Sequence, residues 1–315
     1  MRHVPVIDIS NPTATESAAV DRACRDHGFF LLAGHGLDDL IARTYAEGKR
    51  FFDSDRATKE AIRRTADNPL GYNDRELTKR VRDHKEVFDF TDPQRDELRR
   101  RNRWPDGLDG YEETLCEFYD AFSLLADQTV SLVHDTLGLS ASVAKKHIGS
   151  RQSSAVRLNH YAIGDPVPEA ERDDLADLAE VALGYHTDPG VLTLLLQDNV
   201  GGLQAQSATN GWIDVDPEPG TIVVNLGDVM QVWTNDRYRA AVHRVRPMTT
   251  STRMSIPYFF NPPPSLVVEP IPELVAVTNR YRPFVWAEFM QARNDDNFVD
   301  NGEDTQVTDY AITTP

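Results

Sequence analysis

The sequence predicts a mainly β protein with added helices, and three observations support this class. After Ser153, segments of five to eight residues rich in β-branched and aromatic side chains recur between turn signals. In the first third of the chain, apolar residues recur three or four positions apart, as on helices. A hydrophobic content of 40% over 315 residues is ample for a core. About eight short strands indicate a sandwich or closed barrel, of which a jelly roll is one solution.

Residues 1–150 are expected to form a mostly helical region that packs on this core. Two strands are predicted at Val4–Ile9 and Gly28–Ala33, with a helix over residues 13–26 between them. A second helix is predicted over Leu37–Phe52, where the apolar positions keep helical spacing. This region is expected to supply a wall rather than chemistry.

The middle of the N-terminal region divides into an irregular part and a long helix. Residues 64–109 show no clear periodicity and carry many charges. From Leu115 to Leu137 apolar residues recur three or four apart, and Gly138 is a typical C-terminal stop. A long helix is therefore predicted here.

Residues 151–262 are expected to form the jelly-roll core. Prolines at Asn261–Pro264 end the sheet, and residues 263–315 form a covering segment and tail with a helix near Trp286–Ala292. The whole chain is expected to be one structural unit. The predicted strands are Ser154–Ile163, Val191–Gln197, Leu203–Gln206, Trp212–Val215, Thr221–Asn225, Met230–Trp233, Ala241–Arg246 and Ser251–Phe259.

Charge and composition exclude several classes of protein. Fifty acidic against 33 basic residues give a net charge of −17, which repels phosphate backbones, so no nucleic-acid partner is expected. The longest apolar runs, such as Val191–Leu196, are too short to span a bilayer, so no membrane association is expected. The cysteines, Cys24 and Cys116, do not make a disulfide framework. A cytoplasmic location is the default expectation, and the oligomeric state is left open.

His186 and Asp188 are the first candidates for a metal site. Positions i and i+2 of an extended segment share a face, so an imidazole and a carboxylate point the same way. A third ligand, His243, would arrive from a distant strand. Two histidines and one carboxylate on one face form the facial triad of non-haem Fe(II) oxygenases. A capped turn with a core histidine, or a zinc hydrolase site, is the alternative.

Two further strands present polar groups in rows. On the strand around Arg157, the side chains of Arg157, Asn159 and Tyr161 face one way, and Val156, Leu158 and His160 face the other. Arg253 and Ser255 likewise share a face, which places a guanidinium beside a hydroxyl. The planar fork of arginine can bind a carboxylate through two parallel hydrogen bonds.

With these motifs in register, the chain resembles the isopenicillin N synthase-like family of 2-oxoglutarate- and Fe(II)-dependent dioxygenases. The resemblance extends from Val4 to Phe284 and is densest between Val156 and Phe260. The motifs that carry it, besides His186-Thr-Asp188, are Arg157-Leu-Asn-His-Tyr161, Gly202-Leu-Gln204, Trp212, Asn225-Leu-Gly-Asp228, His243-Arg-Val245 and Arg253-Met-Ser255.

The resemblance implies a double-stranded β-helix core, a set of cofactors and a reaction. His186, Asp188 and His243 would bind Fe(II), and 2-oxoglutarate would chelate it and leave one position for O2. The distal carboxylate of 2-oxoglutarate would reach Arg253 and Ser255, with hydrogen bonds from Tyr161 and Asn159. The reaction would couple decarboxylation of 2-oxoglutarate to succinate with oxidation, mainly hydroxylation, of a C–H bond in a small organic substrate.

Two alternatives stay open at this stage. Isopenicillin N synthase itself keeps the triad and the Arg-x-Ser motif but uses no 2-oxoglutarate, so an Fe(II) oxidase or cyclase of that kind fits the same residues. A non-catalytic jelly-roll binding protein also fits the fold.

Substrate-contacting residues are hard to read from the sequence. The irregular stretch 64–95 and the tail around Arg282–Trp286 are expected to border the pocket. Charged residues of that stretch, including Arg75, Lys79 and Arg80, are expected to be solvated. Asn225 and Asp228 could assist the site, but Asn-x-Gly-Asp is also ordinary turn chemistry, so they are left out of the candidate catalytic residues. Trp212 and Trp233 are expected to be core.

Overall fold

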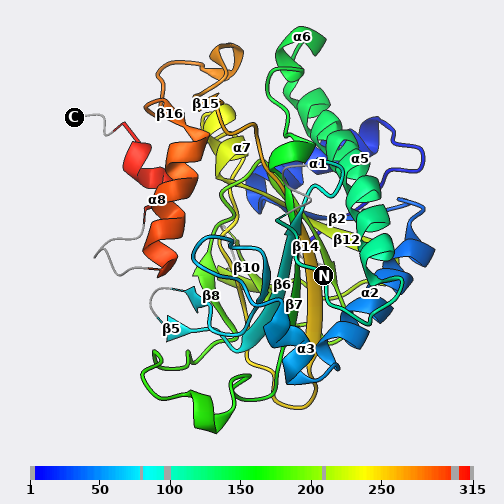
Figure 1. Cartoon of the computed structure of the whole chain (residues 1–315). Helices are drawn as coiled ribbons and strands as arrows, with labels where there is room; N and C mark the ends of the chain where they lie inside the picture. Colours follow the sequence, from blue (N-terminus) through cyan, green and yellow to red (C-terminus); the bar gives the residue numbers. More distant parts are fainter. Residues whose placement is uncertain (1–3, 79–80, 96–100, 208–210, 299–304, 313–315) are drawn as a thin grey trace.

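The computed structural model describes residues 4–78, 81–95, 101–207, 211–298 and 305–312 (Figure 1). Within them, eight strands form a main sheet in the order β1-β2-β12-β9-β14-β7-β6-β3, and four form a smaller sheet in the order β11-β10-β13-β8. The main strands are β1 (Val6–Asp8), β2 (Phe29–Ala33), β3 (Gly71–Asn73), β6 (Lys85–Thr91), β7 (Ala155–Tyr161), β9 (Leu192–Gln197), β12 (Thr221–Leu226) and β14 (Arg253–Phe260). The smaller sheet contains β8 (Leu183–His186), β10 (Leu203–Ser207), β11 (Gly211–Asp214) and β13 (His243–Val245).

The two sheets pack face to face, as the predicted jelly roll requires. Leu195 and Val223 of the main sheet share a buried cluster with Leu203, Ala205 and Val245 of the smaller one. The space between the sheets is therefore partly apolar core, and the rest of it is the pocket described below.

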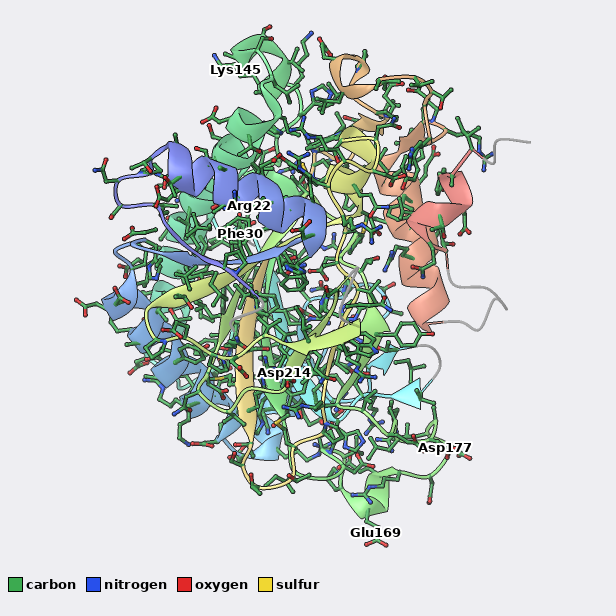
Figure 2. All side chains as sticks on the ribbon, turned by 180° about the vertical axis from the view of Figure 1, so that it is seen from behind. Arg22, Phe30, Lys145, Glu169, Asp177 and Asp214 are labelled. Carbon is green, nitrogen blue, oxygen red and sulfur yellow. The ribbon has the colours of Figure 1, made fainter. Side chains whose placement is uncertain are left out.

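The other face of the main sheet is covered by helices. Leu158, Leu194 and Ile256 point from neighbouring strands into a cluster with Phe118 and Phe122 of the long helix. Figure 2 shows the same layering from behind, with Phe30 on β2 buried under α1 and Arg22 on the outer side of that helix. The covering helices are α1 (Ala14–Asp26), α2 (Asp38–Phe52) and α5 (Tyr111–Leu137).

Local sequence accounts for the ends of these helices. Thr13 caps α1 in a capping box with Glu16, which satisfies free N–H groups of the first turn. Gly138 ends α5 with a φ of 68°, in the left-handed region that favours glycine. Helices α1 and α2 match the predicted ranges to within one residue at each end, whereas α5 begins at Tyr111, four residues before the predicted start.

The remaining elements are short or lie at the C-terminal end. Of the helices in the described part of the chain, none has the length and apolar character to cross a membrane. The remaining elements are α3 (Arg56–Ala61), α6 (Ala141–Ala144), α7 (Asp228–Trp233), α8 (Trp286–Phe298), the paired strands β4 (Leu77–Thr78) and β5 (Val81–Arg82), the paired strands β15 (Val267–Val268) and β16 (Phe284–Val285), and 3-10 turns at Arg151–Ser153, Glu169–Glu171, Pro272–Leu274 and Val307–Tyr310.

Two predictions about secondary structure are wrong. Met230–Trp233 is not a strand but most of helix α7. A short apolar run that is buried on several sides has no periodicity that separates helix from strand. Within the irregular stretch 64–109, residues Lys85–Thr91 form the fully buried strand β6. Its charged residues hid the strand pattern, because they are buried in ion pairs instead of exposed.

The position of β6 also corrects the expectation that residues 1–150 supply only a wall. This strand pairs along its whole length with β7, so residues before 150 belong to the main sheet and reach the pocket. The division at residues 150 and 262 stays a prediction. Trp233 is core as expected, whereas Trp212 is half-buried with the Arg244 guanidinium 4.1 Å from its ring centroid.

Candidate active site

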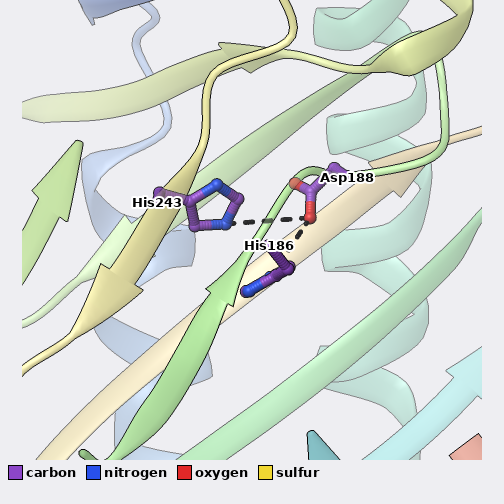
Figure 3. A group of neighbouring side chains, drawn as sticks. All are labelled: His186, Asp188 and His243. Atoms are coloured by element: carbon purple, nitrogen blue, oxygen red, sulfur yellow. Dashed lines mark ion pairs between the residues drawn. The ribbon is translucent and has the colours of Figure 1, made fainter. Parts of the chain in front are cut away.

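The structure brings His186, Asp188 and His243 together between the two sheets (Figure 3). His186 is the last residue of β8 and pairs directly with His243, the first residue of β13. One ligand atom from each of the three residues lies within 4.8 Å of the others. The Asp188 Oδ1 atom lies 3.7 Å from Nε2 of His186 and 3.8 Å from Nε2 of His243. The spacing suits three ligands around one divalent ion.

Backbone carbonyls orient both imidazoles. Nδ1 of His186 lies 2.8 Å from the Gly184 carbonyl, and Nδ1 of His243 lies 3.0 Å from the Ala241 carbonyl. A carbonyl can only accept, so each Nδ1 carries the proton and each Nε2 offers a lone pair to the centre. Burial, and then the neighbouring His243, lower the pKa of His186 to about 3, so its ring is neutral and able to bind a metal.

Two residues on the main sheet fix the carboxylate of Asp188. Its Oδ2 atom accepts hydrogen bonds from Thr193 Oγ1 and from Asn225 Nδ2, the latter at 2.8 Å, which leaves Oδ1 toward the histidines. Burial alone would raise the pKa of Asp188, but the two histidines and these hydrogen bonds lower it below its ordinary value. The carboxylate is therefore ionised, with one oxygen ready for a metal.

Sequence reasoning missed Thr193, and it noted that Asn225 could assist the site but left it out of the candidate catalytic residues. The two residues are direct partners in the β9–β12 ladder, so their side chains meet on the same face. The sequence pattern that could have identified them is a polar residue at an inward position on each of two mainly apolar strands.

The loop that carries Asp188 is also held through its backbone. The amide N–H of Asp228 donates to the Asp188 carbonyl at 2.8 Å, and that of Val229 donates to the Gly190 carbonyl at 3.1 Å. A Cβ atom on Gly227 would lie 2.2 Å from the Gly190 oxygen, so this approach requires glycine. Burial raises the pKa of Asp228 to about 6, although the nearby Arg293 opposes the shift.

Arg253, Ser255, Tyr161 and Asn159 form one polar patch, as the alternation of strand residues predicts. Arg253 pairs with Tyr161 and Ser255 with Asn159 across β14 and β7. The Arg253 guanidinium lies 4.9 Å from the Tyr161 ring centroid, and Asn159 Nδ2 lies 3.4 Å from Ser255 Oγ. The four side chains therefore offer a cation and several hydrogen-bonding groups side by side.

Arg253 is only 1% exposed, yet none of its three guanidinium nitrogens has a hydrogen-bond partner among the described residues. A buried, unpaired cation is costly, by several kcal/mol. The arrangement fits a ligand that brings a carboxylate to this point, as the distal carboxylate of 2-oxoglutarate would.

A cavity of about 450 Å³ contains both the triad and the arginine patch. Its wall on β6 and β7 is a network of buried ion pairs. Arg157 donates to both carboxylate oxygens of Asp89, at 2.7 and 2.9 Å, and to Glu76 at 2.7 Å. Lys85 lies 2.9 Å from Glu76 and 3.2 Å from Asp83. Sequence reasoning missed this network, because its partners lie in the stretch read as irregular.

The expected borders of the pocket are confirmed in part. Arg64, Leu70 and Lys85 line it, in agreement with the role predicted for the stretch 64–95. Of the tail, the lining includes Met290 and Arg293 of α8 and not the residues around Arg282–Trp286.

His160 points away from the pocket, as the strand alternation predicts. Its ring stacks on Phe52, with 5.1 Å between centroids, and its Nδ1 lies 2.8 Å from Glu86. Lys79 and Arg80, expected to be solvated, lie outside the described residues. Arg75 bonds to Glu171 and so is not merely solvated.

Two family models match the chain. Residues 152–262 match the 2OG-Fe(II) oxygenase superfamily, and residues 4–107 match the non-haem dioxygenase in morphine synthesis N-terminal model. The first matched range contains all seven predicted site residues.

Several known proteins are similar over most of their length. Gibberellin 2-beta-dioxygenase 4 of Arabidopsis thaliana is 30% identical over 298 residues, which cover 91% of this chain and 89% of that protein. The structure of a Neurospora crassa protein in complex with alpha-KG and thymine has a TM-score of 0.77 and 25% identity, covering 92% of this chain and 96% of that one. The structure of JOX2 in complex with 2OG, Fe and JA has a TM-score of 0.78 and 26% identity, covering 91% and 84%.

Proposed function

Because this chain belongs to the 2OG-Fe(II) oxygenase superfamily, we propose that it hydroxylates a C–H bond of a small organic substrate. Membership of this superfamily makes the protein an oxidoreductase that uses Fe(II), 2-oxoglutarate and O2. In this proposal His186, Asp188 and His243 hold the iron. The observation that carries it is the convergence of their three ligand atoms within 4.8 Å.

The residues around the triad support this role. Bound there, iron would supply the oxidising chemistry that couples decarboxylation of 2-oxoglutarate to substrate oxidation. The protein's own part is to keep both Nε2 atoms free of protons, through the Gly184 and Ala241 carbonyls, and to keep Asp188 ionised. With His186, Asp188 and His243 as its protein ligands, a bound iron would keep coordination positions open for 2-oxoglutarate and O2.

The arginine patch supports the binding of 2-oxoglutarate. Arg253 would bind its distal carboxylate as a fork, while Ser255, Tyr161 and Asn159 would add hydrogen bonds. The formal charges of Fe(II), Asp188, 2-oxoglutarate and Arg253 cancel, which a buried site requires. The fork would give two of the three unpartnered guanidinium nitrogens the partner that they lack within the described residues.

The substrate would occupy the part of the cavity bounded by the ion-pair network and by apolar residues such as Leu77, Leu183 and Val245. Pockets of roughly 300–1,000 Å³ are usual for small-molecule ligands, and the cavity of about 450 Å³ falls within this range. The relatives' names refer to gibberellin and the solved complexes to thymine and JA, so they support a small organic substrate without choosing one.

Succinate release tests the proposal. The purified protein is loaded with Fe(II) without oxygen, supplied with 2-oxoglutarate, ascorbate and O2, and screened against a panel of metabolites. We expect substrate-stimulated succinate and a product heavier by one oxygen atom. O2 consumption that needs a substrate but no 2-oxoglutarate would instead identify an isopenicillin N synthase-like oxidase. No succinate above the level of an Asp188→Ala control with any metabolite would overturn the proposal.

The non-catalytic alternative has lost its basis. The Arabidopsis thaliana relative is named as a dioxygenase, and a binding protein has no need to keep three convergent ligands beside an arginine that is unpaired among the described residues.

A further inference from the structure

The C-terminal helix α8 reaches into the candidate metal site through one side chain. Arg293 Nη2 donates to the carbonyl of Thr187 at 3.1 Å, and Thr187 is the residue between His186 and Asp188. Its Nη1 atom donates to Asp228 Oδ2 at 3.0 Å. Arg293 therefore connects the last helix of the chain to the loop that carries two of the three proposed ligands.

Asp228 adds a second link between Arg293 and the loop, because Asp228 contacts both of them. Its backbone N–H donates to the Asp188 carbonyl at 2.8 Å, while its side chain accepts from Arg293. The Asp228 side chain is fully buried and that of Arg293 is 15% exposed. A buried carboxylate without its cation is unfavourable, so the pair favours the state in which helix and loop are both in place.

The rest of α8 is anchored in the core, so Arg293 extends from a fixed base. Phe289 is fully buried and lies against Trp286, Phe284 and Tyr310, with ring centroids 5.0 to 6.0 Å apart. Arg293 follows Phe289 by one helical turn, and its guanidinium lies 5.7 Å from that ring.

The same helix also forms part of the pocket wall. Met290 and Arg293 line the cavity, and α8 packs beside β4, whose Leu77 and Thr78 line it as well. A molecule in the cavity can therefore touch α8 directly, and α8 touches the ligand loop through Arg293.

We propose that Arg293 is a positioning residue that couples the docking of α8 to the ordering of the loop 187–190. Loss of Arg293 loosens this loop and weakens metal binding, while a substrate that contacts α8 stabilises the metal-binding conformation. The metal part of this inference rests on the proposed function. The coupling between helix and loop does not, because it concerns the metal-free protein.

Hydrogen exchange of the metal-free protein tests the coupling. The Asp228 and Val229 amides donate to the loop carbonyls, so peptides covering 226–230 and 186–191 report on loop order. In Arg293→Gln we expect exchange of these peptides to accelerate about tenfold, with β14 unchanged. Arg282→Gln removes an exposed arginine from the same C-terminal segment, where it donates to Asp309, and should leave the exchange as in the wild type.

Metal affinity is the second readout, measured by calorimetry with Co(II) alone. Loss of a residue that supports metal ligands typically weakens metal binding 10- to 100-fold, and we expect about tenfold in Arg293→Gln because Arg293 acts through a backbone carbonyl. Arg293→Lys keeps one charged donor and should recover part of the affinity. If the Gln variant does not fold, Asp228→Asn removes the partner charge with little change in shape and should loosen the same peptides.

The outcomes separate the two proposals. If hydrogen exchange and Co(II) affinity in Arg293→Gln are the same as in the wild type, the proposed coupling is overturned. A wild-type protein that binds no metal would overturn the proposed function, while the exchange data would still decide whether Arg293 couples α8 to the loop.

Discussion

The two faces of strand β7 show how one segment serves both stability and function. Val156 and Leu158 point toward the helices and are fully buried among apolar side chains. Arg157, Asn159 and Tyr161 alternate with them and line the cavity. Because side chains on a strand alternate, each face can specialise independently of the other. We therefore expect substitutions on the helical face to change stability alone and substitutions on the cavity face to change ligand binding.

The two faces also differ in the polar groups that they bury. On the helical side, the hydroxyls of Ser123 and Tyr258 lie 2.7 Å apart and satisfy each other. On the cavity side, Lys85 is paired with carboxylates, but Arg253 lies unpartnered among the described residues. A fold normally satisfies its buried charges, so a buried charge that the protein leaves unpaired indicates a ligand.

The largest effect is expected from the removal of a proposed ligand charge. Asp188→Asn keeps the shape of the side chain but not its charge, so we expect turnover to fall by on the order of a thousandfold, or about 4 kcal/mol. The melting temperature of the metal-free protein should change little. Succinate formation and thermal unfolding, measured on the same preparation, check both parts, and turnover within tenfold of wild type would exclude this role for Asp188.

Arg253→Met should change binding and stability in opposite directions. Loss of the fork removes a buried ion pair with 2-oxoglutarate, so we expect its KM to rise about a hundredfold, or about 3 kcal/mol. The ligand-free protein should be as stable as the wild type or more stable, because a buried unpaired charge is gone. Steady-state kinetics and urea unfolding measure the two. A less stable variant with an unchanged KM would assign Arg253 to the fold instead of the site.

Leu158→Ala is the matched substitution on the helical face. The residue is fully buried, so the cavity that it leaves should lower the free energy of unfolding by roughly 2–3 kcal/mol. The KM for 2-oxoglutarate should stay within twofold of the wild type. A large change in KM would show that the two faces are not independent.

The smallest effect concerns pH and the helical face. Burial, together with nearby His147, lowers the pKa of His134 from 6.5 to about 4. Between these values the unfolded state binds more protons than the folded state, so stability is lost as the pH falls from 6.5 toward 4. As the pH falls across this range, the free energy of unfolding of His134→Gln should decrease by about 1–2 kcal/mol less than that of the wild type. Urea unfolding of both proteins across this range measures it, and parallel pH profiles would contradict the assignment.

The sequence predicted what depends on local pattern. Helix α5 and strand β7 follow from apolar spacing, and the joining of His186, Asp188 and His243 follows from alternation together with the family resemblance. The β6 strand was not predicted, because its charged residues are neutralised by partners that are distant in the sequence. Arg157, for example, lies 68 positions from its partner Asp89. Pairings of this kind depend on the tertiary structure and leave no local periodicity.

The roles of the residues that support the site were not predicted, for the same reason. Thr193 is an ordinary polar residue in an apolar strand, and Arg293 lies in a tail read as a cover. Each acquires a role only when folding brings it to the loop of Asp188 from another part of the chain.

Anaerobic titration of the Fe(II)-loaded protein with 2-oxoglutarate tests the central claim most directly. Chelation of the iron by 2-oxoglutarate should produce a weak visible charge-transfer band that saturates near one equivalent in the wild type. In Arg253→Met the same band should require about a hundredfold more 2-oxoglutarate. A wild-type protein that develops no band, with Fe(II) and 2-oxoglutarate both present in excess, would contradict the account.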